Sequence, residues 1–222
     1  PEAKFYQASS SEMFGAAPAP QSLDTPFEPQ SPYATAKLMS HWNAKNYRDG
    51  YGLFVASGIL FNHESPRRGR TFVTKKIAEA AARIHAGQIS HINLGNLSAQ
   101  RDWGYAPDYV VGMWRMLQAD FPQDVILATG KSTTVETFLE LCFEEVDLEW
   151  REYVRHDERL LRPTEVSHLQ GDFSIASKTL DWRSDVGVES LARTMVAHEI
   201  ASLEGRLIDV PTSKLWLEES LG

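Results

Sequence analysis

Four side chains near the amino end of the sequence bring together a hydroxyl, a carboxylate, a phenol and an ammonium. Ser10 and Glu12 are two residues apart, and Tyr33 is followed four residues later by Lys37. Positions four apart share a face of a helix, and an ammonium beside a phenol favours the phenolate form. Tyr33 would then be a usable base at neutral pH. The Tyr33/Lys37 spacing is weak evidence by itself, because it is also typical of an exposed ring beside a solvated lysine.

The elements around these residues could bring them together. Residues 4–9 (KFYQAS) look like the end of a buried strand that runs into the polar segment with Ser10 and Glu12. Five prolines fall between positions 18 and 32, which predicts an extended loop without regular structure. Ser31 and Pro32 then supply an N-cap and a first-turn proline for a helix over 33–47. The loop can fold back and place Ser10 and Glu12 beside the start of this helix.

Strands and helices alternate along the rest of the chain. The apolar run LFVASGILF at 53–61 predicts a strand buried on both faces, as a parallel sheet requires. Further helices are expected at about 71–86, 108–119, 173–180 and 188–204, and further strands at 89–94 and 125–129. Asp108 is expected to cap the second of these helices, and Thr133 with Glu136 has the pattern of a capping box. The alternation predicts an α/β fold.

Composition and charge exclude several classes of protein. The 222 residues are 42% hydrophobic and 23% charged, as is usual for a globular chain that buries a sizeable core. The formal net charge of −8 does not favour binding to nucleic acid or to anionic lipid. No apolar stretch approaches the ~20 residues that a membrane-spanning helix needs. The single cysteine, Cys142, excludes an intrachain disulfide, is expected in the core, and fits a reducing, cytoplasmic location.

The strand end, the Ser/Thr-x-Glu segment, the proline-rich loop and the Tyr-x-x-x-Lys helix together resemble the extended short-chain dehydrogenase/reductase superfamily. Within it, several blocks look like the GDP-mannose 4,6-dehydratase family: YQASSSEMFG, TPFEPQSPYATAKLMSHW, GILFNHESPRRG, LGNLSAQRDWGYAPDYV and LRPTEVSHLQGD. The blocks keep their order over nearly the whole chain. NHESPRRG, RDWG and RPTEV are far more specific than the Tyr/Lys pair.

The resemblance implies a partial Rossmann-like parallel sheet flanked by helices, with an interleaved smaller α/β substrate-binding domain. It also implies bound NADP, which takes a hydride from carbon 4 of GDP-mannose and returns it to carbon 6 after water is eliminated across carbons 5 and 6. Tyr33 would take the proton of the 4-hydroxyl, Lys37 would hold the phenolate, and Ser10 would bond the same oxygen. Glu12 would remove the carbon 5 proton and protonate the departing 6-hydroxyl.

The same resemblance implies two sets of binding residues. The positions that match cofactor contacts are Tyr33, Lys37, His63 and Arg68, and those that match sugar-nucleotide contacts are Asn62, Arg101, Arg162 and Glu165. Without it, the basic run around Arg68 would be read as a solvated loop. The histidines show no metal-ligand spacing, so no metal is expected. The expected partners are GDP-mannose and further copies of the chain, as a homodimer or homotetramer, with neither nucleic acid nor membrane.

Three features depart from the family pattern. No G-x-G-x-x-G occurs, although a Rossmann domain binds pyrophosphate through that turn, and the chain begins at Pro1 within an expected strand. The sequence is therefore expected to be a carboxy-terminal portion. Residues 1–63 would be the second part of the NADP-binding domain, and 64–222 mainly the sugar-nucleotide domain, with about 102–130 returning to the first. Ser10 replaces the usual threonine, and the segment between Trp150 and Arg162 is shortened.

Two other interpretations stay open. A related sugar-nucleotide epimerase, or a dehydratase for another nucleotide sugar, would share the Tyr33/Lys37 pair, but an epimerase would not need Glu12 for elimination. A non-catalytic remnant that binds partners through an oligomer surface would need none of the four groups.

Overall fold

The structure is a computed structural model that describes residues 3–161 and 164–214. Its strands are β1 (Phe5–Ser10), β2 (Val55–Leu60), β3 (Asn62–Glu64), β4 (Ile92–Leu94), β5 (Gln100–Arg101), β6 (Trp103–Tyr105), β7 (Asp124–Leu127), β8 (Thr133–Thr134) and β9 (Val154–His156). Its α-helices are α1 (Pro32–Tyr51), α2 (Val73–His85), α3 (Ala106–Gln118), α4 (Val135–Glu144), α5 (Ser174–Leu180) and α6 (Val188–Leu203). The short 3-10 helices are η1 (Ser11–Phe14), η2 (Trp150–Glu152) and η3 (Glu158–Leu160).

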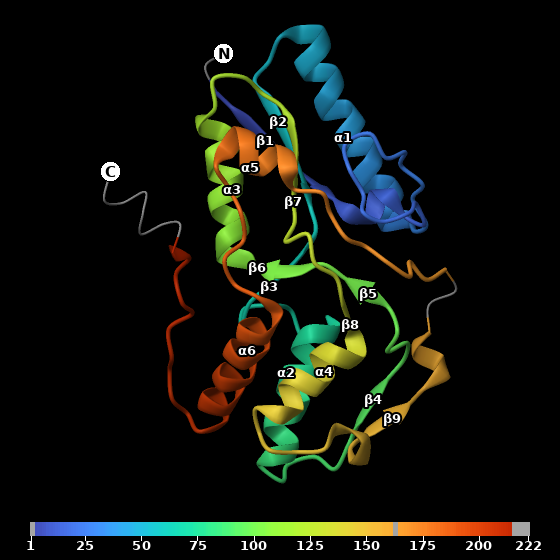
Figure 1. Cartoon of the computed structure of the whole chain (residues 1–222), viewed down its shortest axis with the longest axis vertical. Coiled ribbons are helices and arrows are strands. Elements are labelled where there is room, and N and C mark those ends of the chain that lie inside the picture. The colour runs from blue at the N-terminus through green and yellow to red at the C-terminus, as the bar shows by residue number, and fades with distance from the viewer. Residues whose placement is uncertain (1–2, 162–163, 215–222) are drawn as a thin grey trace.

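The central sheet has the strand order β1-β2-β7, and both pairings are parallel. Helix α1 covers one face, and α3 and α5 cover the other (Figure 1). The predicted α/β fold with a partial parallel sheet is confirmed. Every residue of β2 is buried, as expected for a central strand covered on both faces.

Side chains alternate between the two faces of this sheet, as the pleat requires. Ile59 and Ile126 pack with Phe14 and Phe61 on the side of η1. Their neighbours Leu60 and Leu127 join the cluster formed with α3 and α5. Two separate cores therefore hold the sheet in place between its helices.

A second layer of helices lies beyond one end of the sheet. Helices α2, α4 and α6 pack on one another and enclose a third core (Figure 1). Cys142 is fully buried there, which confirms its predicted core position, and burial raises the pKa of its thiol well above the usual range. The remaining strands form two-stranded ladders, which are β3-β6, β4-β9 and β5-β8.

Helix α1 begins as the sequence predicts, but it continues to Tyr51 and so ends later than the expected residue 47. The Ser31 hydroxyl accepts a hydrogen bond from the Ala34 backbone N–H at 3.1 Å, and Pro32 occupies the first turn. The helix ends at Gly52, whose φ of 65° is favoured only by glycine. The other predicted helices and strands also form, although β4 is shorter than expected. Among the described residues no helix is long and apolar enough to cross a membrane.

Two predicted helix caps are wrong. Asp108 lies inside α3, fully buried, and its carboxylate accepts hydrogen bonds from the Ser184 and Ser213 hydroxyls and the Asp185 N–H. Helix α4 is capped by Thr134, whose hydroxyl accepts from the Thr137 N–H at 3.0 Å, and not by the residue before it. In the first case distant partners compete for the carboxylate. In the second, Thr134 is the residue directly before the first residue of the helix, and its hydroxyl reaches the Thr137 N–H.

Candidate active site

Several predicted site residues lie where strands of the central sheet end: Ser10 is the last residue of β1, and Asn62 and His63 follow β2. The register places Ser10 beside Leu60 and Leu60 beside Leu127, so β1, β2 and β7 end side by side. In open α/β sheets, ligands bind in the crevice outside the carboxyl ends of the strands. This edge is therefore the candidate active site.

The turn after β1 fixes Ser10 and Glu12 relative to each other. The Ser10 hydroxyl oxygen accepts a hydrogen bond from the Glu12 N–H at 3.3 Å, which leaves the hydroxyl proton to be donated elsewhere. Gly15 ends the turn with φ at 55°, and a Cβ there would lie 1.7 Å from the Glu28 carbonyl oxygen. Only glycine allows this approach, so the proline-rich loop packs directly against the turn that presents the Glu12 carboxylate.

Tyr33 and Lys37 lie on one face of the first turns of α1. The Lys37 ammonium is 5.8 Å from the centre of the Tyr33 ring, and it donates to the Ala8 carbonyl at 3.0 Å. Lys37 therefore ties the helix to strand β1 just before Ser10. The Tyr33 side chain is 56% exposed, so its phenol is accessible to a ligand.

A buried histidine adds a second tie between β1 and α1. The Ser9 hydroxyl and His41 Nδ1 are 2.9 Å apart, and both residues are buried. Burial lowers the pKa of His41, and the charges of nearby Arg48 and Lys45 act in the same direction against Asp124. A neutral imidazole is the form that such a site favours. The sequence did not single out this residue.

The segment after β2 presents Asn62 and His63. His63 Nδ1 lies 2.8 Å from the Phe61 carbonyl, so it must carry the proton, and Nε2 is left as a hydrogen-bond acceptor. Burial lowers the pKa of His63, whose ring stacks on that of Tyr109 with centres 4.9 Å apart. The Asn62 Oδ1 atom is buried and has no hydrogen-bond partner among the described residues.

Glu64 holds the predicted cofactor ligand Arg68. Its carboxylate lies 2.9 Å from Arg68 Nε and accepts a hydrogen bond of 2.7 Å from the Thr74 hydroxyl. The Arg68 guanidinium also stacks 3.5 Å from the centre of the Phe72 ring. Burial raises the pKa of Glu64 to about 7, although the charge of Arg68 and the hydrogen bond from Thr74 lower it.

We expect replacement of Glu64 by glutamine to flatten the dependence of stability on pH. The pKa of Glu64 is raised from 4.5 to about 7, so the folded state holds this proton more tightly than the unfolded state. The free energy of unfolding of the wild type should therefore fall as the pH rises from about 4.5 to about 7, by about 3 kcal/mol from this group. Urea unfolding at several pH values measures the difference.

The exposed Glu140, changed to glutamine, is the control for that measurement, and it should leave the pH dependence as in the wild type. Parallel curves for the wild type and the Glu64→Gln variant between pH 5 and pH 8 would contradict the expectation.

The predicted sugar-nucleotide ligands Arg101 and Glu165 lie together. Arg101 Nη2 is 3.2 Å from Glu165 Oε1, and the Arg101 side chain is almost fully buried. Arg162 lies outside the described residues. The pair comes from segments 64 residues apart in the sequence, so the fold assembles this part of the site.

Asp102, next to Arg101, connects its own segment to two others, so that three segments meet at its side chain. This buried carboxylate accepts hydrogen bonds from the N–H and hydroxyl of Thr129 at 2.8 and 2.6 Å, and from the N–H groups of Gly130 and Gly171 at 2.9 and 3.2 Å. Burial raises its pKa, while these hydrogen bonds lower it. The residue lies within the RDWG block, but nothing in the sequence indicated its partners.

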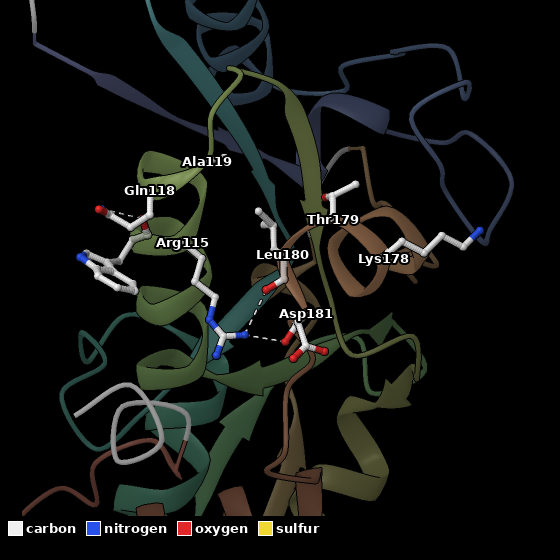
Figure 2. Close-up of a pocket in the computed structure, with 8 residues that line it drawn as sticks. Arg115, Gln118, Ala119, Lys178, Thr179, Leu180 and Asp181 are labelled. Carbon is white, nitrogen blue, oxygen red and sulfur yellow. Dashed lines mark hydrogen bonds between the residues drawn. The ribbon is translucent and has the colours of Figure 1, made fainter. Parts of the chain in front are cut away.

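A cavity of about 480 Å³ lies elsewhere, between the ends of α3 and α5 (Figure 2). The Arg115 guanidinium beside it donates to the carbonyls of Leu180 and Asp181. Lys4, which precedes β1, bonds the Leu117 carbonyl at the same end of α3. The cavity is thus at the amino edge of the sheet, opposite to the candidate site, and no predicted site residue lines it.

The structure therefore brings the predicted residues together in three groups. Ser10 bonds Glu12, Lys37 lies over Tyr33, and Arg101 pairs with Glu165, while His63 and Arg68 follow the adjacent strand. Among the described residues, no cluster of three or more His, Cys, Asp and Glu side chains is placed to hold a metal ion.

Comparison with known proteins identifies close relatives of the sequence. A family model described as GDP-mannose 4,6 dehydratase matches residues 1–195. The chain is 53% identical over 208 residues to GDP-mannose 4,6 dehydratase 2 of Arabidopsis thaliana, covering 93% of this chain and 56% of the relative. It is 49% identical to GDP-mannose 4,6-dehydratase of Sinorhizobium fredii, covering 91% of this chain and 63% of the relative. The chain thus spans somewhat more than half of these relatives.

Solved structures with low sequence identity share the fold. RMD from Pseudomonas aeruginosa, solved with NADPH, gives a TM-score of 0.82 at 19% identity and covers 90% of this chain and 67% of that one. The dTDP-glucose 4,6-dehydratase of Bacillus anthracis, solved with NAD, gives 0.80 at 16% identity and covers 91% and 63%. At such identities the similarity establishes the fold alone.

Proposed function

Because the chain belongs to the GDP-mannose 4,6-dehydratase family, we propose that it supplies the catalytic and sugar-binding part of an enzyme that converts GDP-mannose to GDP-4-keto-6-deoxymannose. The observation that supports the proposal is the hydrogen bond from Lys37 Nζ to the Ala8 carbonyl at 3.0 Å, which holds the first turns of α1 beside the end of β1. Ser10 is the last residue of β1, and Glu12 follows it in η1. Tyr33 and Lys37 lie in the first turns of α1, and Lys37 connects this helix to Ala8 of β1.

NADP fits the residues at this edge. The exposed Tyr33 phenol, the Lys37 ammonium beside it and the acceptor Nε2 of His63 offer the groups that a nicotinamide ribose needs. Arg68, held by Glu64 and Phe72, offers a positioned cation. When bound, NADP supplies a hydride acceptor and donor for the sugar. Tyr33, Lys37, His63 and Arg68 would hold it.

In the first half of the proposed reaction, Tyr33 takes the proton of the 4-hydroxyl as carbon 4 is oxidised. Lys37 stabilises the phenolate by its positive charge and stays in place through its bond to the Ala8 carbonyl. The Ser10 oxygen already accepts a hydrogen bond from the Glu12 N–H, so its hydroxyl proton is available to be donated to the same sugar oxygen. A threonine at this position would provide the same hydroxyl.

In the second half, Glu12 acts first as a base and then as an acid. Its carboxylate removes the proton from carbon 5, which the new 4-keto group has made acidic, and protonates the departing 6-hydroxyl. One group can serve both steps, because the proton that Glu12 takes from carbon 5 is the one it gives to the oxygen of the departing 6-hydroxyl. Elimination therefore waits for oxidation. The product is complete only after carbon 6 receives the hydride that carbon 4 gave up and carbon 5 takes a proton, which balances the one that Tyr33 removed from the 4-hydroxyl.

The sugar nucleotide would be held by Asn62, Arg101, Arg162 and Glu165. The buried Asn62 Oδ1 has no partner among the described residues and suits a sugar hydroxyl. A planar guanidinium suits a bidentate contact with a diphosphate. We extend the proposal to the domains expected from the sequence, with residues 1–63 on the cofactor side, 64–222 mainly on the sugar-nucleotide side and about 102–130 returning to the first. A cytoplasmic homodimer or homotetramer is proposed on the family resemblance.

The test is to assay the chain alone and in a joined enzyme, in which the portion of the Arabidopsis thaliana relative that precedes its match to this chain is fused ahead of residue 1. We expect the joined enzyme to form GDP-4-keto-6-deoxymannose, detected by NMR, and not to turn over UDP- or dTDP-sugars. The intact plant relative is the positive control.

A folded joined enzyme that leaves GDP-mannose unchanged would reject the proposal. Interconversion of UDP- or dTDP-sugars would favour an epimerase or another dehydratase. NADP binding that cannot be detected in either protein would favour a non-catalytic remnant.

A further inference from the structure

One buried glutamine attaches the proline-rich loop, which joins Glu12 to Tyr33, to a segment far along the chain. We call residues 164–172 the seam. The Gln21 N–H donates to the Gln170 carbonyl at 2.8 Å, and the Asp172 N–H donates to the Gln21 carbonyl at 2.8 Å. These bonds form a parallel bridge between Gln21 and Gly171. Nearly 150 residues separate the two segments in the sequence.

The side chain of Gln21 adds three hydrogen bonds to this bridge. Its Nε2 atom donates to the Ala17 carbonyl at 3.0 Å and to the His168 carbonyl at 3.3 Å, while its Oε1 atom accepts from the Gln170 N–H at 2.9 Å. The residue is fully buried. Both donors are used, and a carboxylate would place a charge against two carbonyl oxygens. The site therefore requires an amide of this length.

The other side of the seam holds the proposed sugar-nucleotide residues. The Gln100 N–H donates to the Ser167 carbonyl at 2.8 Å, and the Leu169 N–H donates to the Gln100 carbonyl at 3.1 Å. Arg101 follows Gln100 and pairs with Glu165 inside the seam. The seam thus lies between the proline-rich loop and the Arg101 strand.

A second bond connects the seam to the far end of the same loop. The Thr164 hydroxyl donates to the Gln30 carbonyl at 2.8 Å. Gln30 directly precedes Ser31, the N-cap of the helix that carries Tyr33. The loop is therefore fixed to the seam at two points, one toward Glu12 and one toward Tyr33.

We propose that Gln21 is a positioning residue that couples sugar-nucleotide binding at the seam to the placement of Glu12 and Tyr33. A ligand that binds Arg101 and Glu165 would reduce the motion of the seam. The hydrogen bonds of Gln21 to the seam would then reduce the motion of the proline-rich loop as well. Glu12 lies nine residues before Gln21, so its carboxylate depends on where the loop is held. This inference rests on the proposed function, because it takes the same residues as catalytic and binding groups.

The test compares Gln21→Leu with the wild type in the joined enzyme, and follows hydrogen exchange in the same proteins. We expect kcat per folded active site to fall about tenfold or more in the variant, with a smaller change in KM. GDP-mannose should slow exchange in peptides covering both the seam and residues 13–21 of the wild type. In the variant, the slowing should be confined to the seam.

Two further variants separate positioning from folding. Thr164→Val removes the exposed hydroxyl that bonds Gln30, keeps the shape of the side chain, and should lower kcat in the same direction by a smaller factor. Gln118→Leu, an exposed glutamine at the end of α3, is the matched control and should leave kcat and KM unchanged. If Gln21→Leu fails to fold, Thr164→Val decides by the same measurements.

If Gln21 had a purely structural role, Gln21→Leu would lower thermal stability but leave kcat per folded site unchanged. GDP-mannose would then still slow exchange in both the seam and residues 13–21 of the variant, and that result would overturn the inference. A joined enzyme without any turnover would count against the proposed function instead. In that case hydrogen exchange would test the coupling. If GDP-mannose protected residues 13–21 equally in the wild type and the Gln21→Leu variant, or in neither, the inference would be overturned.

Discussion

Replacing Glu12 by glutamine in the joined enzyme is expected to reduce formation of GDP-4-keto-6-deoxymannose by about 10³-fold. Glutamine has nearly the same shape and keeps the backbone N–H that bonds the Ser10 hydroxyl. It cannot accept the proton from carbon 5 or deliver it to the leaving hydroxyl. Product formation followed by NMR measures the loss.

The same variant should leave the earlier steps intact. Tyr33, Lys37 and Ser10 are unchanged, so oxidation at carbon 4 should continue, and binding of GDP-mannose should stay close to that of the wild type. Glu28→Gln is the matched control, because Glu28 is an exposed residue of the proline-rich loop whose backbone N–H bonds the Met13 carbonyl in the same turn, and the substitution keeps that backbone contact. It should retain normal turnover.

Turnover by Glu12→Gln above about a tenth of the wild-type rate would show that another group carries the proton, since a positioned acid or base contributes at least about 10²-fold. Loss of substrate binding in this variant would instead indicate that Glu12 acts mainly as a ligand of the sugar. Either result would remove the assignment of elimination to this residue.

The second large effect is expected for stability, on replacing Asp102 by alanine. The buried carboxylate accepts three backbone N–H groups and one hydroxyl from Thr129, Gly130 and Gly171. Alanine would remove this acceptor from the three backbone N–H groups, while the Thr129 hydroxyl could still donate to the Lys131 carbonyl at 3.2 Å. Each unsatisfied buried donor costs about 1–3 kcal/mol. We expect the free energy of unfolding to fall by about 4 kcal/mol.

Urea unfolding of the 222-residue chain measures this change. Asp102→Asn should also destabilise the chain, because its amide N–H₂ would face backbone N–H groups that need an acceptor. The control is Asp120→Ala, an exposed aspartate after α3, which should change stability by no more than about 0.5 kcal/mol. A loss below about 1 kcal/mol for Asp102→Ala would show that water replaces the carboxylate.

These two residues differ in how far the sequence could identify them. Glu12 was found because the Ser-x-Glu, Tyr-x-x-x-Lys and loop patterns occur together and resemble a known family. Asp102 stands in an equally specific block, RDWG, yet its role was not predicted. Its partners lie 27 to 69 residues away in the sequence, and no local pattern indicates such contacts.

The same distinction holds for the elements of the fold. Helix α1 was predicted with its cap, because Ser31 and the Ala34 N–H are three residues apart and their bond is local. Strand β2 was predicted because its apolar run is continuous. Asp108 was assigned to a cap because of its type and position, but Ser184, Asp185 and Ser213 bind its carboxylate instead. A tertiary contact replaced the local preference.

The sequence by itself determined the α/β class, most helices and strands, and the family to which the chain belongs, because these depend on residue type and short spacing. The tertiary structure alone decided that Gln21 joins the proline-rich loop to the seam, that Glu64 holds Arg68, and that Asp102 joins three segments. These contacts depend on buried donors and acceptors that meet only after the chain has folded. A buried polar group must find a partner wherever the fold provides one, and the distance along the sequence does not limit that choice.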